Sequence, residues 1–150
     1  MNLHRDWREF IELLNSRGVE YLVVGAHARA FHGVPRSTGD IDFFVRPAPE
    51  NAARMEEVTR VLGFSSLGLS ARDFEQPDQV IQLGHEPYRI DVVTSISGVG
   101  FDDAWSDRVE ARLDGLPVAF LSLRALRKNK LAAGRAKDLA DLEALPGTPE

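Results

Sequence analysis

Two aspartates stand one residue apart in the segment GVPRSTGDIDFFV, residues 33–45. Side chains at positions i and i+2 of a β-strand lie on the same face, so Asp40 and Asp42 are expected to point in the same direction, with Cα atoms about 7 Å apart. Ile41 and Phe43 then point to the opposite face, which is predicted to be core. A strand that begins in this way carries two like charges on one side.

Two ionised carboxylates this close repel each other unless a cation neutralises them. A divalent metal ion suits them, because Mg²⁺ commonly binds one or two protein carboxylates together with the phosphates of a substrate. A pair of solvent-exposed aspartates at the start of a strand would give the same short motif without any metal. The pair at Asp40 and Asp42 therefore needs further residues to support a functional interpretation.

A third aspartate, Asp91, lies in the middle of the apolar run YRIDVVT, residues 88–94. Ile90 and Val92 are expected to face the core, so Asp91 points to the other side of its strand. An ion pair with Arg89, which shares that side, would explain Asp91 without any function. If this strand neighbours the first one, the three aspartates instead form the kind of carboxylate cluster that serves two-metal phosphoryl transfer.

Residues that could hold phosphate lie on both sides of the first strand. The run LVVGAHA, residues 22–28, predicts a strand, a turn at Gly25-Ala26 and the start of a helix, whose free amide groups suit an anion such as triphosphate. His27, beside this turn, could also contact phosphate. Just before the aspartates come a guanidinium and two hydroxyl groups that could hold phosphate oxygens, although turn and capping chemistry would use the same types: Arg36, Ser37 and Thr38.

The C-terminal part of this acidic chain contains a basic stretch. Between residues 121 and 137 there are six basic residues and no acidic one: Arg124, Arg127, Lys128, Lys130, Arg135 and Lys137. A solvated helix face would account for such a stretch. A phosphate-binding role for at least Lys130 is the alternative.

The elements needed to position these residues are strands alternating with helices. Six strand candidates follow from β-rich runs bounded by turn residues, at 19–24, 41–45, 80–83, 88–94, 109–113 and 116–120. Asp114-Gly115 predicts a tight hairpin between the last two strands, and Pro117 suggests that the last strand lies at an edge. We therefore predict an α/β (α+β) fold, with a mixed central sheet of five to six strands packed with helices.

Helices are predicted between these strands. Trp7, Phe10, Ile11 and Leu14 fall at helical spacing, and further helices are expected at 26–33, 50–62, 122–133 and 135–145. Residues 64–77 show only a weak pattern, so most of that segment is predicted to be loop. No repeat or long linker divides the chain. We expect one domain spanning residues 1–150, with the C-terminal helices at 122–145 packed on it.

Composition excludes several classes of protein. With 43% hydrophobic and 27% charged residues, the 150-residue chain is expected to fold. It has no cysteine, which excludes disulfides, thiolate metal sites and cysteine nucleophiles. The charged N-terminus and short apolar runs indicate neither a signal peptide nor a membrane span, so a cytoplasmic location is expected. The chain also lacks a P-loop, a dinucleotide-binding glycine motif, a serine elbow and a zinc-protease helix.

Taken together, these motifs resemble the signature of the DNA polymerase β nucleotidyltransferase superfamily. Gly25-Ala26, then Arg36-x-Thr38-x-Asp40-Ile41-Asp42, then Asp91 follow its order of a Gly-Gly or Gly-Ser turn, an Asp-x-Asp strand and a later single aspartate. KNKLAAGRAKDLADLEAL, residues 128–145, resembles the Lys and Arg-x-Lys-Asp-x-x-Asp segments of small bacterial members, including relatives of abortive-infection toxins. One departure is Ala26, where many active members carry serine or glycine, which leaves the turn without a hydroxyl contact to phosphate.

The resemblance implies a role for each residue. Asp40 and Asp42 would bind a Mg²⁺ or Mn²⁺ ion that bridges a nucleoside triphosphate, and Asp91 would bind a second ion and help to activate an acceptor hydroxyl. Nucleotide contacts are implied for six residues: Gly25, Ala26, Arg36, Ser37, Thr38 and Lys130. Four more residues are expected near the site, with Asp138 holding Arg135 or a lysine: His27, Arg135, Lys137 and Asp138.

The leading hypothesis is a metal-dependent nucleotidyltransferase that moves a nucleoside monophosphate from a triphosphate such as ATP to an acceptor hydroxyl. The acceptor could be an RNA end, a protein or a small molecule, and the resemblance suggests the toxin of a toxin–antitoxin pair, with an antitoxin partner, as one setting. A domain of the same fold that binds a nucleotide or a partner without catalysis is the alternative, motivated by Ala26. A metal-dependent sugar-transferring enzyme is a third hypothesis, which the later Asp91 and the phosphate turn fit less well.

Overall fold

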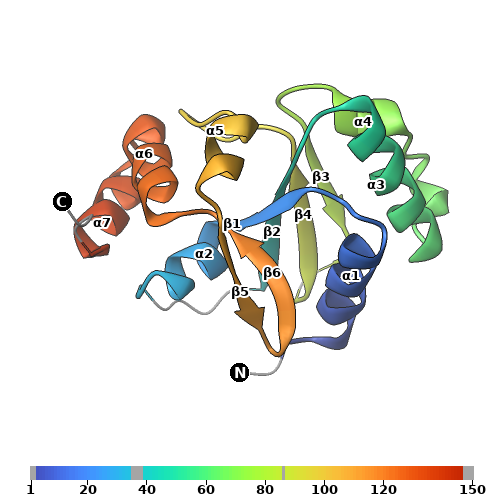
Figure 1. The fold of residues 1–150 in the computed structure, drawn as a ribbon, viewed down its shortest axis with the longest axis horizontal. Coiled ribbons are helices and arrows are strands. Elements are labelled where there is room, and N and C mark those ends of the chain that lie inside the picture. The colour runs from blue at the N-terminus through green and yellow to red at the C-terminus, as the bar shows by residue number, and fades with distance from the viewer. Residues whose placement is uncertain (1–2, 35–38, 86, 147–150) are drawn as a thin grey trace.

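The computed structural model describes residues 3–34, 39–85 and 87–146. In these residues a six-stranded mixed sheet separates two groups of helices (Figure 1). The strand order is β3-β4-β2-β1-β6-β5. The strands are β1 (Tyr21–Val24), β2 (Asp40–Val45), β3 (Val80–Leu83), β4 (Arg89–Val93), β5 (Val109–Leu113) and β6 (Leu116–Phe120).

The directions of the strands decide which residues meet. β2 runs antiparallel to β1 and parallel to β4, and β1 runs parallel to β6. β3 and β5 are antiparallel edge strands on β4 and β6. Because β2 and β4 are parallel neighbours, residues on their matching faces lie side by side.

One face of the sheet is covered by α1 (Arg5–Ser16), α3 (Pro49–Val61) and α4 (Ala71–Glu75), on the right in Figure 1. The core on this face includes Phe10, Phe43 and Val92, all fully buried. The periodic apolar residues predicted for α1 form the buried side of that helix. This side of the sheet is therefore apolar and carries no candidate site residue of β2 or β4.

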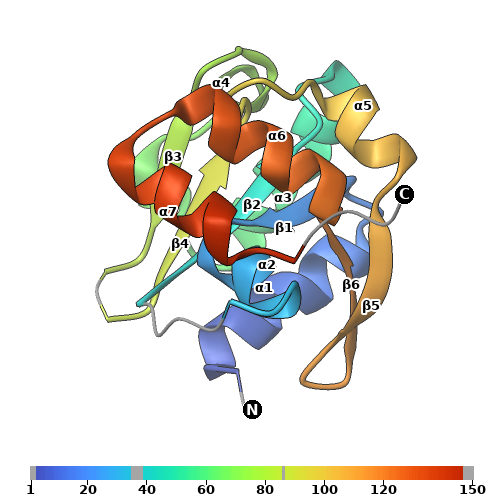
Figure 2. The same ribbon diagram turned by 90° about the vertical axis from the view of Figure 1, so that its left-hand side faces the viewer.

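The opposite face is covered by α2 (Gly25–Phe31), α5 (Phe101–Ser106), α6 (Leu123–Ala133) and α7 (Ala136–Ala144). Figure 2 shows α6 and α7 in front of the sheet with α2 close to them. Leu22, Phe44 and Leu126 belong to the core on this face. Ser122 caps α6 by accepting a hydrogen bond from the amide of Ala125, and Gly134 ends that helix in the left-handed conformation.

The predicted fold class is confirmed, with three differences in detail. The segment 64–77, predicted as loop, contains a short 3₁₀ helix at Ser65–Leu67 and the helix α4, which a capping box begins at Ser70. The helix α5 was not predicted, because it has only six residues. The expectation that Pro117 marks an edge strand is wrong for β6, which lies between β5 and β1.

Pro117 is tolerated in β6 for a local reason. The register of β6 with β1 is set by Val23 opposite Phe120, and Pro117 precedes that pairing. Its missing N–H therefore removes no bond to β1 at this pairing. None of the helices in the described ranges is both long enough and apolar enough to cross a membrane.

Candidate metal and nucleotide site

The parallel pairing of β2 with β4 brings the three aspartates together. Asp42 lies directly opposite Asp91, and Asp40 lies opposite Arg89. One carboxylate oxygen from each of Asp40, Asp42 and Asp91 lies within 4.8 Å of the others. The three side chains share a face, because the neighbours of Asp42 and Asp91 in their strands are buried on the other side of the sheet: Ile41, Phe43, Ile90 and Val92. The expected convergence of the carboxylates is observed, and their catalytic role stays a prediction.

Arg89 binds two of the three carboxylates. Its Nε donates to Oδ1 of Asp91 at 2.8 Å, and its Nη2 donates to Oδ2 of Asp40 at 2.9 Å and to Oδ2 of Asp91 at 3.1 Å. The ion pair that the sequence offered as an alternative explanation of Asp91 is therefore present. It does not replace the cluster, because one guanidinium balances only one of three negative charges.

The pKa of Asp42 reflects its burial beside two other carboxylates. It is raised from 3.8 to about 7, chiefly because burial disfavours the charged carboxylate, and further because of the charges of Asp91 and Asp40 and a hydrogen bond with Asp91. The positive charge of Arg29 acts in the opposite direction. A further cation would stabilise the ionised form of such a carboxylate. The donor set thus fits a hard divalent ion such as Mg²⁺ or Mn²⁺, which prefers carboxylate oxygens.

The turn that follows β1 lies directly against the aspartates. Gly25 has a φ of +66°, and a Cβ atom at this position would lie 2.2 Å from Oδ2 of Asp42. Only glycine allows both the backbone conformation and this close approach. The next residue, Ala26, is buried and brings no hydroxyl to the turn. The turn therefore fixes where the backbone lies relative to Asp42.

His27 follows the turn, and its ring contacts an aromatic side chain. Its ring meets that of Trp7 edge-on, with the ring centroids 5.3 Å apart. Burial lowers the pKa of His27, and the charge of Asp40 partly opposes this effect. The ring is thus expected to be neutral, which suits a hydrogen bond better than a charge contact with phosphate.

The three other residues predicted to bind phosphate near the aspartates lie outside the described residues: Arg36, Ser37 and Thr38.

Lys130 lies in a buried ionic network on the same side of the sheet. Its Nζ lies 3.1 Å from Oδ1 of Asp138 and 3.3 Å from Oδ2 of Asp141, and all three side chains are at most 7% exposed. Arg135 donates from Nε to Oδ2 of Asp138 at 2.6 Å. The Arg135 hydrogen bond, together with Lys130, holds the pKa of Asp138 well below its usual range. Asp138 thus contacts both a lysine and Arg135.

Arg29 and Asp141 were not singled out from the sequence as site residues. Nε of Arg29, on α2, lies 3.5 Å from Oδ2 of Asp141, on α7, and the two side chains are 10% and 4% exposed. Because Arg29 also lowers the pKa of Asp42, it connects the carboxylate cluster electrostatically with the network around Lys130. Its position four residues after Gly25 places it on the inner side of α2. No sequence pattern distinguishes such an arginine from one on a solvated helix face.

Two of the other four basic residues of this stretch, Arg124 and Lys128, are paired with acidic residues. Arg124 binds Asp107 at 2.6 Å and Asp103 at 3.2 Å, and Lys128 lies 3.5 Å from Asp103. Lys137 is exposed on α7. The local excess of positive charge in the sequence is therefore mostly neutralised in three dimensions.

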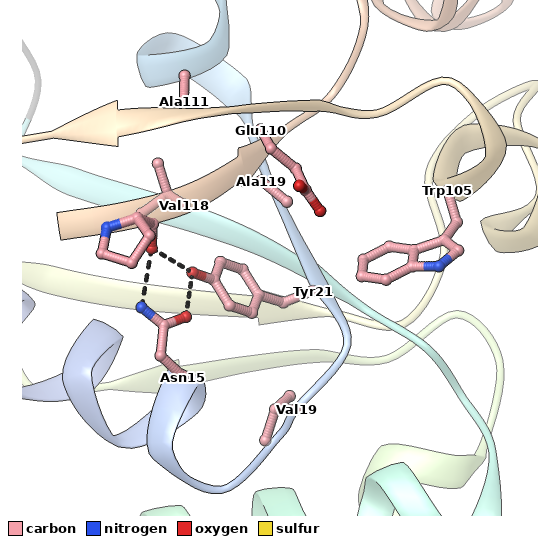
Figure 3. Close-up of a pocket in the computed structure, with 9 residues that line it drawn as sticks. Asn15, Val19, Tyr21, Trp105, Glu110, Ala111, Val118 and Ala119 are labelled. Carbon is pink, nitrogen blue, oxygen red and sulfur yellow. Dashed lines mark hydrogen bonds between the residues drawn. The ribbon is translucent and has the colours of Figure 1, made fainter.

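A cavity of about 270 Å³ lies elsewhere, beside β1, β5 and β6 (Figure 3). The hydroxyl of Tyr21 donates to Oδ1 of Asn15 at 2.8 Å, and Nδ2 of Asn15 donates to the carbonyl oxygen of Pro117 at 2.8 Å. Trp105 and Glu110 also line it. None of the three clustered aspartates does, so this cavity is not part of the candidate site.

Comparison with known proteins gives matches in structure but not in sequence. No protein-family model matches the chain, and no curated protein matches its sequence. A solved structure of a Thermotoga maritima protein, provisionally named a nucleotidyltransferase, is similar with a TM-score of 0.60 and 19% identity, over 93% of this chain and 89% of that one. ANT(2″)-Ia, solved in complex with adenylyl-2″-tobramycin, is similar with a TM-score of 0.56 and 15% identity, over 91% of this chain and 83% of that one.

At these identities the likeness establishes the fold. The chain has a nucleotidyltransferase fold along nearly its whole length. The relation to abortive-infection toxins is not established by these matches. The likeness agrees with the α/β fold that the sequence predicts.

Proposed function

We propose that this protein is a metal-dependent nucleotidyltransferase that transfers a nucleoside monophosphate from a nucleoside triphosphate to an acceptor hydroxyl. The observation that carries the proposal is the convergence of Asp40, Asp42 and Asp91 within 4.8 Å, next to a glycine turn that lies against Asp42. Three carboxylates that converge in this way repel one another, and a bound divalent cation would offset that repulsion.

Two divalent ions would be held by the three carboxylates, Asp40 and Asp42 on the side of the triphosphate and Asp91 on the side of the acceptor. When bound, such ions neutralise charge on the triphosphate and on the attacking oxygen. The acceptor oxygen forms a bond to the α-phosphorus, and the bond from that phosphorus to the bridging oxygen breaks. Pyrophosphate leaves with the electron pair, and the acceptor proton passes to Asp91 and then to water. Positioning of the reactants and neutralisation of charge would supply most of the rate enhancement.

The nucleotide contacts are part of the same proposal. The backbone at Gly25 and Ala26, together with Arg36, Ser37 and Thr38, is proposed to hold the triphosphate. Lys130 already has two carboxylate partners, so a phosphate at this site would share it with Asp138 and Asp141. The acidic pair would then set the position of the lysine, which is otherwise a flexible side chain.

A nucleotide-binding or partner-binding domain without catalysis is the second candidate. It is favoured by Ala26, which is 7% exposed and supplies no hydroxyl group to the turn. Arg89 supports the same candidate, because it stabilises Asp40 and Asp91 without any metal. A role as the toxin of a toxin–antitoxin pair, restrained by an antitoxin, is compatible with the first candidate and would fix its acceptor.

The test is label transfer from each of the four α-labelled nucleoside triphosphates, with Mg²⁺ or Mn²⁺ and a cell extract as the source of acceptors. Transfer is expected with the unmodified protein and is expected to disappear in Asp42→Asn. Asp6→Asn is the matched control, since Asp6 is an exposed aspartate on α1. Asp40→Asn and Asp42→Asn are expected to lose affinity for Mn²⁺ while they remain folded in metal-free buffer.

Other results would favour other functions. Retained nucleotide binding without transfer of any label, with every triphosphate and both metals, would support the non-catalytic candidate. Transfer of a sugar from a nucleotide-sugar would support the third hypothesis. Collapse of the melting temperature of Asp42→Asn in metal-free buffer would make that residue structural.

A further inference from the structure

Two adjoining cavities form a groove on the side of the sheet that carries α1 and α3, opposite the three aspartates. The cavities measure about 520 Å³ and about 150 Å³, and Glu9 and Leu62 line both of them. The groove runs along α1 and the end of α3, on the right in Figure 1. We call it the α1–α3 groove.

The floor of the α1–α3 groove is apolar and partly open to solvent. Val61 is 51% exposed and Tyr88 is 46% exposed. Leu13, Leu62 and Phe64 are partly buried and pack on the core beneath. Apolar side chains gathered in an open groove are typical of a surface that another molecule covers.

The rim of the groove is acidic. Asp6, Glu9 and Glu12 project from α1, and their side chains are 60%, 55% and 56% exposed. Neither cavity has a lysine or an arginine among the described residues that line it. Arg60, on α3, lines a separate cavity together with Glu56. The charges that border the groove directly are therefore all negative.

The arginines of α1 compensate this rim only in part. Arg5 lies 3.9 Å from Glu9, and Arg8 lies 3.9 Å from Glu12, both beyond hydrogen-bond distance. Arg8 is bound at 2.8 Å to Asp114. Three carboxylates on the rim thus face one arginine that is not engaged by Asp114, and the groove complements a positively charged ligand.

The shape of the groove favours a helix as its occupant. Its walls are mostly side chains of α1 and α3, whose backbone groups are bonded within those helices. An extended segment placed there would find no backbone partners, whereas a helix satisfies its own N–H and C=O groups. The stretch of α1 from Asp6 to Ser16 is about 15 Å long, the length of about three helical turns.

We infer that the α1–α3 groove is a docking site for a basic amphipathic helix of a partner protein. Apolar side chains of that helix cover Val61 and Tyr88, and its lysine or arginine side chains pair with the carboxylates of the rim. The groove and the aspartate cluster lie on opposite sides of the sheet, so the partner leaves the candidate metal site open. This inference goes beyond the proposed function and does not rest on it.

The experiment measures binding of three fluorescein-labelled synthetic peptides of about 14 residues by fluorescence anisotropy. One has leucines at helical spacing and lysines elsewhere, the second has glutamates in place of the lysines, and the third has the lysine composition in an order without an apolar face. The first peptide is expected to bind with a Kd of about 1–100 µM, and at least about tenfold more tightly than the other two.

Variants of exposed residues locate the bound peptide. The double variant Glu9→Gln, Glu12→Gln is expected to raise the Kd of the first peptide about three- to tenfold. Val61→Ser is expected to have an effect of similar size, because an apolar contact is lost. The matched controls are Glu143→Gln, an exposed glutamate on α7, and Leu131→Ser, a 65% exposed leucine on α6, which leave the Kd unchanged.

Several outcomes would overturn the inference. Equal binding of the three peptides, no binding of the first peptide, or equal Kd values in the groove variants and their controls would remove the site. Loss of peptide binding in Asp42→Asn would place the peptide at the aspartates instead. Self-association of the protein that Val61→Ser abolishes, measured by sedimentation, would assign the groove to a second copy of this chain. Absence of Asp42-dependent label transfer would remove the proposed function alone.

Discussion

Gly25 and Asp42 are in such close contact that no side chain fits between them. A Cβ atom at residue 25 would lie 2.2 Å from Oδ2 of Asp42 and 3.0 Å from its Cγ. Residue 25 also has a φ of +66°, which L-residues other than glycine seldom adopt. The position of the Asp42 carboxylate on β2 therefore depends on the backbone of the turn after β1.

Gly25→Ala is expected to displace Asp42 and to weaken metal binding at least tenfold. Gly18→Ala is the matched control, because Gly18 has a φ of +70° and nothing within 4 Å of the added Cβ. Both substitutions are expected to cost about 1 kcal/mol of folding free energy for the backbone conformation. Mn²⁺ titration and thermal unfolding of both variants measure the two effects separately. Equal metal affinity in the two variants would contradict the proposed contact.

The raised pKa of Asp42 predicts how the stability of the metal-free protein changes with pH. Because the folded state has a pKa of about 7 and the ordinary value is 3.8, the folded protein holds this proton more tightly than the unfolded chain does. The contribution of Asp42 to stability is then largest below the ordinary value and falls as pH rises between about 4 and about 7, on the order of 1–3 kcal/mol in all. Asp42→Asn is expected to remove this part of the pH dependence.

Thermal unfolding in EDTA across this pH range provides the measurement. With Mn²⁺ present, the decline is expected to become smaller, because the ion takes the place of the proton on the carboxylates. Apparent affinity for Mn²⁺ should fall as the pH is lowered through about 7. An unchanged pH dependence of stability in Asp42→Asn would show that the carboxylate is not held in its protonated form.

Arg89 is predicted to balance part of the charge of the aspartate cluster when no metal is bound. Arg89→Met removes a guanidinium that binds both Asp40 and Asp91, so the mutual repulsion of these two carboxylates increases. A loss of about 1–3 kcal/mol in unfolding free energy is expected in EDTA at about pH 8, with part of it recovered by Mn²⁺. Arg17→Met, which breaks an exposed pair with Glu57, is expected to cost less than about 1 kcal/mol and to be insensitive to Mn²⁺.

Denaturant unfolding of the two arginine variants, with and without Mn²⁺, distinguishes these outcomes. If Mn²⁺ stabilises both variants equally, Arg89 has no special relation to the metal site. If Arg89→Met unfolds the protein even with Mn²⁺, the guanidinium is structural and the second candidate function gains support.

The carboxylate cluster could be predicted from the sequence because strand geometry is local. The i and i+2 spacing placed Asp40 and Asp42 on one face, and the apolar neighbours of Asp91 placed it on one face of its own strand. That β2 and β4 are neighbours does not follow from either segment, since strand pairing depends on the path of the whole chain. The expectation that these strands are neighbours came from the order of the motifs, which resembles the signature of the DNA polymerase β nucleotidyltransferase superfamily.

The surroundings of the cluster could not be predicted in the same way. Arg29 and Asp141 are 112 residues apart in the sequence and meet only because α7 packs beside α2. From its sequence, the basic stretch is expected to be either a solvated helix face or a phosphate site. Most of its charge is instead paired with aspartates on other elements, such as Asp103. Long-range ion pairs leave no periodic pattern in a sequence, so they become visible only in three dimensions.

The network around Lys130 is predicted to act as one unit. Lys130→Met leaves Asp138 and Asp141 buried without their lysine, and a loss of about 3–5 kcal/mol of unfolding free energy is expected. Asp141→Asn alone is expected to cost less, because Asp138 still holds the lysine. The double variant is expected to lose less than the sum of the two single losses, since the second substitution removes a buried charge that has already lost its lysine partner. Denaturant unfolding of the four proteins measures this coupling, and additive losses would show that Lys130 and Asp141 act independently.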